Sequence, residues 1–146
     1  MSFNIAIDGP AGAGKSTIAK KIAKELGFVY VDTGAMYRAM ALYFLRSNIS
    51  NEDEQAISRA SENVEITIQY ENGEQQVFLN GENVSGEIRK EEVGNMASKT
   101  SGYGQVRKKL VELQQQLAKK ADVVMDGRDI GTVVLPDAQV TVYLTA

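Results

Sequence analysis

Residues 9–16, GPAGAGKS, match the phosphate-binding pattern G-x-x-x-x-G-K-[ST] without a gap. The glycines of this pattern let the backbone wrap closely around phosphate oxygens, where a side chain would obstruct the approach. Several main-chain N–H groups then point at the phosphates, and the loop leads into the positive end of a helix dipole. The spacing places Lys15 to reach the β- and γ-phosphates and the Ser16 hydroxyl to bind Mg²⁺. The sequence therefore predicts a site for a nucleoside triphosphate or a close relative.

A second group of candidate residues follows two other apolar segments. Asp126 ends one of them and suits the acidic partner that holds Mg²⁺ beside such a loop; a turn or capping role is the alternative. Arg128 could hold a phosphate in its fork of donors, and Asp129 could accept a hydrogen bond from an exocyclic amine. Arg38, shortly after Asp32, should project towards the same cleft, although spacing alone also fits a surface arginine in a helix salt bridge.

The elements that must position these residues alternate between strands and helices. We expect strands at 3–7, 28–31, 122–126 and 140–144, and helices from the loop to a C-cap at Gly27, then at 35–46, 53–62, 87–98 and 105–120. Strands separated by helices imply a parallel sheet, whose ligand sits outside the carboxyl ends of its strands. The glycine loop, residues 32–34 and residues 126–129 should therefore face one cleft.

Between residues 63 and 85 the hydrophobic period changes from that of a helix to that of a strand. Val64, Ile66 and Ile68 alternate with polar neighbours, and Asn72-Gly73 is a strong tight-turn signal. We interpret this stretch as a small antiparallel β insertion. The predicted fold class is therefore α/β, with a parallel sheet flanked by helices and interrupted by this insertion.

Composition excludes several kinds of chemistry. The 146 residues are 43% hydrophobic and include neither cysteine nor histidine, so disulfides, thiolate nucleophiles, histidine bases and imidazole zinc sites are impossible. The net charge of −3 argues against a nucleic-acid or membrane partner, and we interpret the basic run at 107–109 as a solvated helix face. With no signal-like segment and no apolar run of membrane-spanning length, we expect a cytoplasmic protein.

Three motifs, in this order, closely resemble the bacterial cytidylate (CMP) kinases, which belong to the P-loop nucleoside monophosphate kinases. They are DGPAGAGKST at 8–17, DTGAMYR at 32–38 and DGRDIGTVV at 126–134. Residues 84–89, VSGEIR, look like the end of the β insertion typical of that family. The resemblance runs along the whole chain, and the second and third motifs separate the family from adenylate and guanylate kinases.

The resemblance implies Mg²⁺-dependent transfer of the ATP γ-phosphoryl group to CMP or dCMP by a monomer. It assigns a P-loop core to residues 1–35 and 120–146, and a nucleoside monophosphate (NMP)-binding region to 36–119. The ATP-binding residues implied are Gly9, Pro10, Ala11, Gly12, Ala13, Gly14, Lys15, Ser16 and Thr17, and those for Mg²⁺ are Ser16 and Asp126. The CMP-binding residues implied are Thr33, Tyr37, Arg38, Ser98, Arg107, Arg128 and Asp129, and the catalytic residues are Lys15, Arg38 and Arg128.

Family members continue beyond the strand that ends near Ala146, into a mobile arginine-rich lid, a further strand and a final helix. Because the lid supplies arginines to the transferring phosphoryl group, we expect the 146-residue chain to be weakly active or inactive. We also expect the strand at 140–144 to be left as an exposed edge.

Two other functions remain open on the sequence alone. One is a P-loop kinase for a small metabolite, of the shikimate or gluconate type, although such a site has no need of the cytosine-reading set Ser98, Arg107 and Asp129. The other is a nucleotide-binding module without catalysis, for which ATP binding without CMP-dependent ADP release would be the signature.

Overall fold

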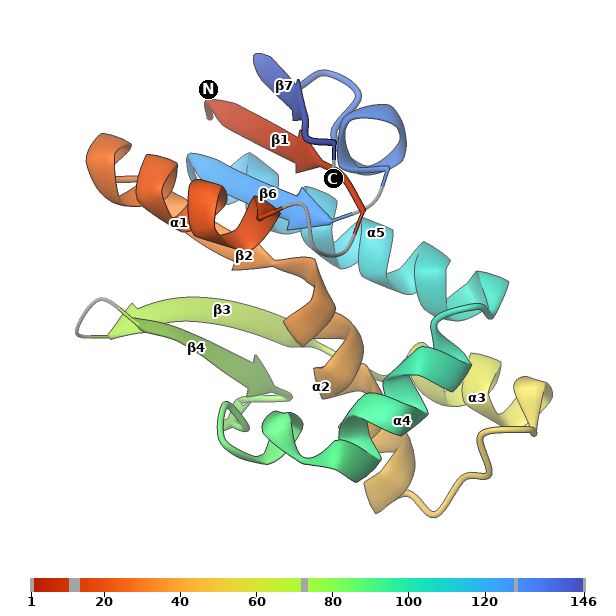
Figure 1. The fold of residues 1–146 in the computed structure, drawn as a ribbon. Coiled ribbons are helices and arrows are strands. Elements are labelled where there is room, and N and C mark those ends of the chain that lie inside the picture. The colour runs from red at the N-terminus through yellow and green to blue at the C-terminus, as the bar shows by residue number, and fades with distance from the viewer. Residues whose placement is uncertain (1, 11–13, 72–73, 128, 146) are drawn as a thin grey trace. The chain divides into compact units, whose positions relative to one another are not determined.

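The computed structural model describes residues 2–10, 14–71, 74–127 and 129–145 (Figure 1). The chain divides into two compact units, one of residues 1–33 with 114–146 and the other of residues 34–113. In the described ranges, no helix is both long and apolar enough to cross a membrane.

The described part of the first unit contains a parallel sheet in the strand order β2-β6-β1-β7, which confirms the predicted parallel core. The bounds of these strands are β1 Asn4–Asp8, β2 Val29–Asp32, β6 Val123–Gly127 and β7 Val140–Tyr143. Residues 5–7 of β1 are at most 5% exposed, because neighbours pair on both sides and helices or loops cover the faces. This continuous burial explains why the strand reads as an apolar run.

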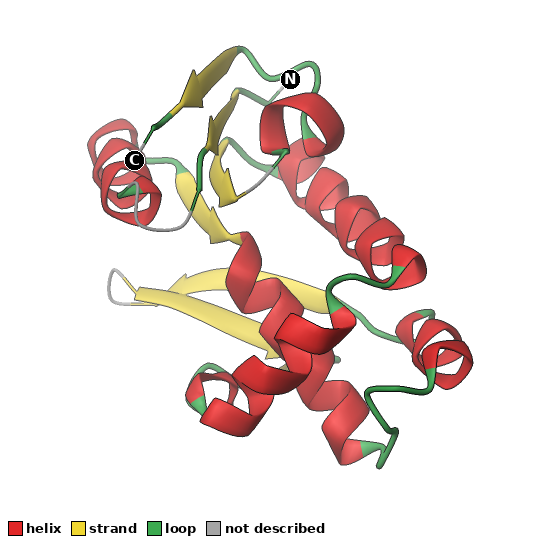
Figure 2. Ribbon diagram, turned by 45° about the vertical axis from the view of Figure 1, so that its right-hand side comes forward, coloured by secondary structure: helices red, strands yellow, loops and turns green. Residues whose placement is uncertain are grey.

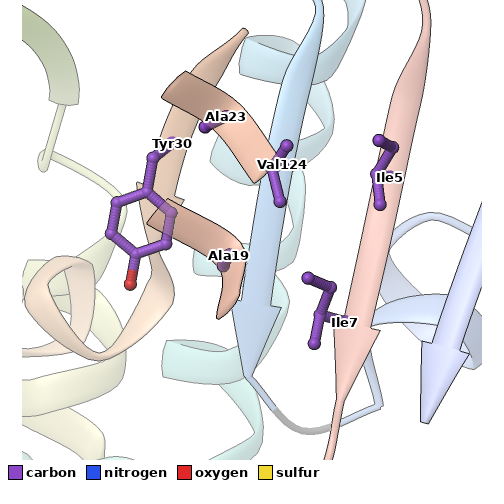
Figure 3. Close-up of a cluster of buried hydrophobic side chains, with 6 residues drawn as sticks. All are labelled: Ile5, Ile7, Ala19, Ala23, Tyr30 and Val124. Carbon is purple, nitrogen blue, oxygen red and sulfur yellow. The ribbon is translucent and has the colours of Figure 1, made fainter. Parts of the chain in front are cut away.

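Helix α1 (Lys15–Leu26) packs on this sheet through small side chains. Ala19 and Ala23 lie against Ile5, Ile7, Tyr30 and Val124 (Figure 3). Of the other apolar residues at helical spacing, Ile22 is partly buried, whereas Ile18 and Leu26 are 38% and 53% exposed. The buried face of α1 is therefore narrower than the apolar stripe in its sequence. The small side chains of alanine let the helix approach the strands closely. Gly27 is the predicted C-cap, with φ 72°, and its N–H donates to the Ala23 carbonyl.

The chain after β6 forms one turn of π-helix, η2 (Ile130–Val134), and then enters β7. Gln115 in the last part of α5 donates to the Val134 carbonyl at 3.0 Å and so ties that helix to η2. β7 lies at one end of the described strand order, with Tyr143 70% exposed. The expected edge strand is thus present.

The second unit carries the β insertion and several helices (Figure 2). The described strands β3 (Ile66–Glu71), β4 (Glu74–Leu79) and β5 (Glu82–Asn83) are antiparallel in that order. The register sets Ile66 opposite Leu79 and Ile68 opposite Val77, as alternation predicts. The predicted turn at Asn72-Gly73 lies outside the described residues.

The helices that accompany this sheet are α2 (Thr33–Arg46), α3 (Glu54–Ser61), α4 (Glu91–Thr100) and α5 (Gly104–Lys120), with a short 3₁₀ turn η1 (Glu87–Arg89) before α4. α2 begins two residues earlier than expected and buries Met36, Met40 and Phe44 completely. Its last residue, Arg46, donates to Glu82 at 2.9 Å and to Glu87 at 2.7 Å, which joins the end of α2 to β5 and η1.

The prediction of one helix over 87–98 is wrong. Lys90 has extended backbone (φ −65°, ψ 145°), so η1 ends there and α4 begins at Glu91. The acidic pair Glu91 and Glu92 lies in the first turn of α4, where carboxylates are favoured by the helix dipole. Glu91 and Glu92 were therefore the sequence signal for a helix that begins at position 91, and this signal was not used in the prediction.

Candidate functional site

The glycine loop begins at the end of the central strand, as predicted. Gly9 and Pro10 follow β1, and Gly14, with a left-handed φ of 81°, precedes the first residue of α1. Ser16 and Thr17 are exposed in the first turn of that helix, so their hydroxyls and the early backbone N–H groups are accessible to an anion. The positions predicted to bind ATP at Ala11, Gly12 and Ala13 lie outside the described residues.

Gly9 is required by a close approach rather than by its φ angle. A Cβ atom on Gly9 would lie 2.6 Å from the carbonyl oxygen of Leu144. The chain is held there because the Leu144 N–H donates to the Asp8 carbonyl at 2.8 Å. The start of the loop is therefore packed against the segment that follows β7.

The Lys15 side chain lies back across the loop, where its ammonium group donates to the Pro10 carbonyl at 3.3 Å. This is the one acceptor that the described residues offer the ammonium, and because a neutral carbonyl holds a charge weakly, the ammonium can turn towards a phosphate when one is bound.

Asp126 lies at the end of β6, with only 5% of the residue exposed. Its carboxylate accepts a hydrogen bond from the Tyr30 hydroxyl at 2.9 Å. Burial raises the pKa of the Asp126 carboxyl to about 6; the Tyr30 bond and the charges of Lys15 and Lys20 lower it, whereas Asp32 raises it. A buried carboxylate whose charge is this poorly compensated suits a site that takes up a cation.

Asp126 and Ser16 fit the small protein share of a P-loop magnesium site, where phosphate oxygens and water complete the coordination. The described residues contain no group of three or more histidine, cysteine, aspartate or glutamate side chains arranged to hold a metal by themselves. A site for Mg²⁺ would therefore depend on the nucleotide for most of its ligands.

Thr33, predicted to hold the acceptor nucleotide, is buried at the start of α2. Its hydroxyl donates to the Asp126 carbonyl at 2.8 Å. Gly127 leaves room for this contact, since a Cβ there would lie 2.4 Å from the Thr33 hydroxyl oxygen. The hydroxyl proton is thus used to join the start of α2 to β6, and the oxygen keeps its acceptor capacity.

In the second unit the structure brings together Tyr37 of α2 and Arg107 of α5, both predicted to bind CMP. Burial raises the pKa of the Tyr37 hydroxyl, while the charge and the hydrogen bond of Arg107 lower it. The pair presents a guanidinium beside a phenol, which is a donor-rich arrangement that suits an anionic or carbonyl-bearing ligand.

Arg38 of α2 is anchored on a different pair of elements. Its guanidinium donates to the Ile88 carbonyl of η1 at 3.2 Å. It also lies over Gly94 of α4, where a Cβ would come within 3.4 Å of Nη2. Ser98 is one helical turn further along α4 and is exposed, so it shares the side of the helix on which Gly94 lies. Within the described residues Arg38 donates to a carbonyl and forms no ion pair, so the alternative of a helix salt bridge is not supported.

Asp129 is exposed and adopts a left-handed backbone (φ 58°, ψ 29°) immediately before η2. Its side chain makes no capping bond to that turn. The caps come instead from Asp8, whose carboxylate accepts from the N–H groups of Ile130 at 2.5 Å and Gly131 at 2.9 Å. Arg128 lies outside the described residues.

Asp8 is the residue whose role the sequence reasoning missed. It stands inside the first motif, yet a carboxylate directly before the glycine loop was given no function. The signal available was its position at the end of an apolar strand, the same position that singled out Asp126.

Comparison with known proteins agrees with these motifs. The family model described as cytidylate kinase matches residues 5–146. A cytidylate kinase of Caldicellulosiruptor saccharolyticus is 54% identical over 144 residues, which are 99% of this chain and 64% of that relative. Those of Caldanaerobacter subterraneus subsp. tengcongensis and Lactobacillus johnsonii are 56% and 51% identical, covering 100% and 99% of this chain and 63% of each relative. The chain thus spans just under two thirds of the length of these curated relatives.

Proposed function

The chain belongs to the cytidylate kinase family, and from that premise we propose that it forms the ATP- and CMP-binding part of a kinase. The reaction proposed is transfer of the ATP γ-phosphoryl group to CMP or dCMP, giving CDP or dCDP and ADP. The observation that carries the proposal is the setting of the P-loop. Lys15 follows β1, the buried carboxylate of Asp126 lies at the end of the neighbouring parallel strand β6, and the charge of Lys15 lowers the pKa of that carboxyl.

The chemistry asks for positioning and charge compensation rather than for a base. An oxygen of the CMP phosphate attacks the γ-phosphorus while the bond to the β,γ-bridging oxygen breaks, and ADP leaves with that electron pair. The attacking oxygen is already anionic, so the absence of histidine is no obstacle. Lys15 would hold the β- and γ-phosphates, and Arg38 and Arg128 would bind the acceptor phosphate. Ser16 and Asp126 would hold Mg²⁺, which supplies further compensation of phosphate charge when bound.

Recognition of cytosine is proposed to rest on Ser98, Arg107 and Asp129. Cytosine presents an exocyclic amine as donor and ring acceptors beside it, which a carboxylate, a guanidinium and a hydroxyl complement. Uracil presents a carbonyl in place of the amine and would leave the carboxylate facing an acceptor. Mismatches of this kind discriminate strongly, because both groups lose their solvation without gaining a bond.

The proposal extends to a monomeric protein acting in the cytoplasm, where ATP and nucleoside monophosphates meet. The net charge of −3 supports small-molecule substrates over nucleic acid.

Coupled ADP release, measured with ATP and Mg²⁺ at high enzyme concentration, tests this function. CMP, dCMP, UMP, AMP and shikimate are offered in turn, with Lys15→Met as the variant that removes the phosphate-binding ammonium. We expect release only with CMP and dCMP, and none above background from Lys15→Met. Release with shikimate or AMP but not with CMP would contradict the proposal. A protein that binds ATP but releases no ADP when CMP is added, both as the 146-residue chain and in a longer form, would contradict it as well.

A further inference from the structure

Asp8 is a buried carboxylate, 7% exposed, placed at the end of β1 directly before Gly9. Its two oxygens accept from two successive backbone N–H groups, those of Ile130 at 2.5 Å and Gly131 at 2.9 Å. The approach is close, because a Cβ on Gly131 would lie 3.2 Å from Asp8 Oδ2 and 2.5 Å from Thr141 Cγ2. Both acceptor oxygens are therefore occupied by the segment that follows β6.

That segment needs external support. Asp129 has a left-handed backbone, which aspartate adopts more readily than most residues but less readily than glycine, so contacts from outside the segment help to keep it there. Its side chain makes no capping hydrogen bond to the turn that follows. The first N–H groups of η2 are satisfied by Asp8 instead, and charge-assisted bonds of this kind are stronger than neutral ones.

We infer that Asp8 is a positioning residue of the acceptor site. Through its two oxygens it holds the backbone of Ile130 and Gly131, and thereby fixes how Asp129 presents its side chain. The inference rests on the proposed function, since it takes Asp129 as the reader of cytosine. Asp8 also connects Asp129 to the phosphate-binding loop, because the first residue of that loop, Gly9, follows Asp8 in the chain. The backbone carbonyl of Asp8 in addition accepts a hydrogen bond from the Leu144 N–H.

The test uses Asp8→Asn and Asp8→Ala, with Asp122→Asn as matched control. Asp122 likewise accepts a backbone N–H in the same unit, that of Phe3 at 2.6 Å, but it lies before β6, at the amino ends of the strands. Asparagine at position 8 keeps one acceptor oxygen and turns an NH₂ group towards the second N–H, whereas alanine removes both acceptors.

Affinities for CMP and for ATP with Mg²⁺ are measured by calorimetry, and amide hydrogen exchange is followed at Ile130 and Gly131. We expect Asp8→Asn to weaken CMP binding about 10-fold and Asp8→Ala about 10- to 100-fold, because N–H groups left without an acceptor no longer hold the segment that carries Asp129 in place. ATP affinity should stay within about 3-fold, since the hydrogen bonds that the described residues make to the Asp8 side chain come from Ile130 and Gly131. Exchange at the two amides should accelerate in both variants, and Asp122→Asn should change none of these quantities.

Equal losses of CMP and ATP affinity, accompanied by a lower melting temperature, would overturn the inference and leave Asp8 a purely structural residue. Unchanged CMP affinity despite faster exchange would overturn it as well. If the wild-type chain does not bind CMP, the proposed function itself is contradicted. Amide exchange in Asp8→Ala then still decides whether Asp8 holds the backbone of Ile130 and Gly131. Faster exchange at these two amides supports that part of the inference, and unchanged exchange rates contradict it.

Discussion

At the scale of single residues, Asp126 shows a conflict between stability and function. Its carboxylate is buried at the end of β6 with one hydroxyl donor, and its pKa of about 6 means that the folded state holds the charged form at a disadvantage. A structural aspartate with no further task would be replaced by a neutral residue at little loss. A bound cation would remove this disadvantage, which is what the proposed magnesium role requires.

Replacing Asp126 by asparagine should therefore stabilise the chain at high pH. Above pH 6 the wild-type carboxylate is charged in both states, and the folded state carries the full penalty. As the pH falls from about 6 towards the unfolded value near 3.8, the folded state takes up the proton first, so wild-type stability rises. We expect Asp126→Asn to exceed the wild type by about 1–2 kcal/mol at pH 8 and by little near pH 4.

Thermal or urea unfolding of both proteins across this pH range measures the difference. Asp122→Asn serves as the control for removing one negative charge from the same unit. Mg²⁺ with ATP should stabilise the wild type more than Asp126→Asn. An asparagine variant that is less stable than the wild type at pH 8 would contradict the account of Asp126.

At the scale of elements, Arg38 depends on the surface of a neighbouring helix. Its guanidinium is held between the Ile88 carbonyl of η1 and the bare backbone of Gly94 in α4. Glycine within a helix is unfavourable by roughly 1 kcal/mol relative to alanine. A Cβ at position 94 would stand 3.4 Å from Nη2 of Arg38, which is ordinary contact, so only a larger side chain is expected to displace the guanidinium.

Gly94→Leu should displace Arg38 and weaken CMP binding about 10- to 100-fold, the loss expected for one charge-assisted phosphate contact. ATP affinity should not change, because Gly94 belongs to the other unit from the P-loop. Gly102→Leu is the matched control, since a Cβ there meets nothing within 4 Å. Calorimetry with CMP and with ATP separates the two effects. If Gly94→Leu and Gly102→Leu bind CMP with the same affinity, Gly94 does not position Arg38.

Local patterns predicted the elements better than they predicted contacts between them. The strand, glycine loop and helix at the start of the chain follow from spacing alone, and so does the alternation of the β3–β4 pair. The start of α4 was missed because the acidic pair Glu91 and Glu92, which favours a helix start, was not used as a boundary signal. The Tyr30–Asp126 and Asp8–Ile130 bonds join residues 96 and 122 positions apart, and no local pattern encodes such pairs. Tyr37 with Arg107 was expected only through the family resemblance.

At the scale of the whole molecule, the chain covers 64% of a typical relative, and β7 lies at the edge of the described sheet with Tyr143 largely exposed. We predict that the 146-residue chain binds both nucleotides but transfers phosphate at least about 100-fold more slowly than a full-length relative, because the resemblance implies arginines on the moving phosphoryl group in the part of the relatives that this chain does not match. Single-turnover ADP formation by the two proteins, side by side, gives the comparison. Equal rates would contradict this prediction and show that the 146 residues suffice for catalysis.

The central claim is that the acceptor is a cytidine nucleotide, and calorimetric titration of the wild-type chain with CMP and with UMP tests it most directly. Binding does not depend on turnover, and Asp129→Asn offers a matched variant, since asparagine tolerates the left-handed backbone at that position. We predict that the wild-type chain binds CMP at least about 100-fold more tightly than UMP, and that Asp129→Asn narrows this ratio by providing a donor for the uracil carbonyl. Equal affinity of the wild-type chain for CMP and UMP, or a ratio that Asp129→Asn leaves unchanged, would contradict the account.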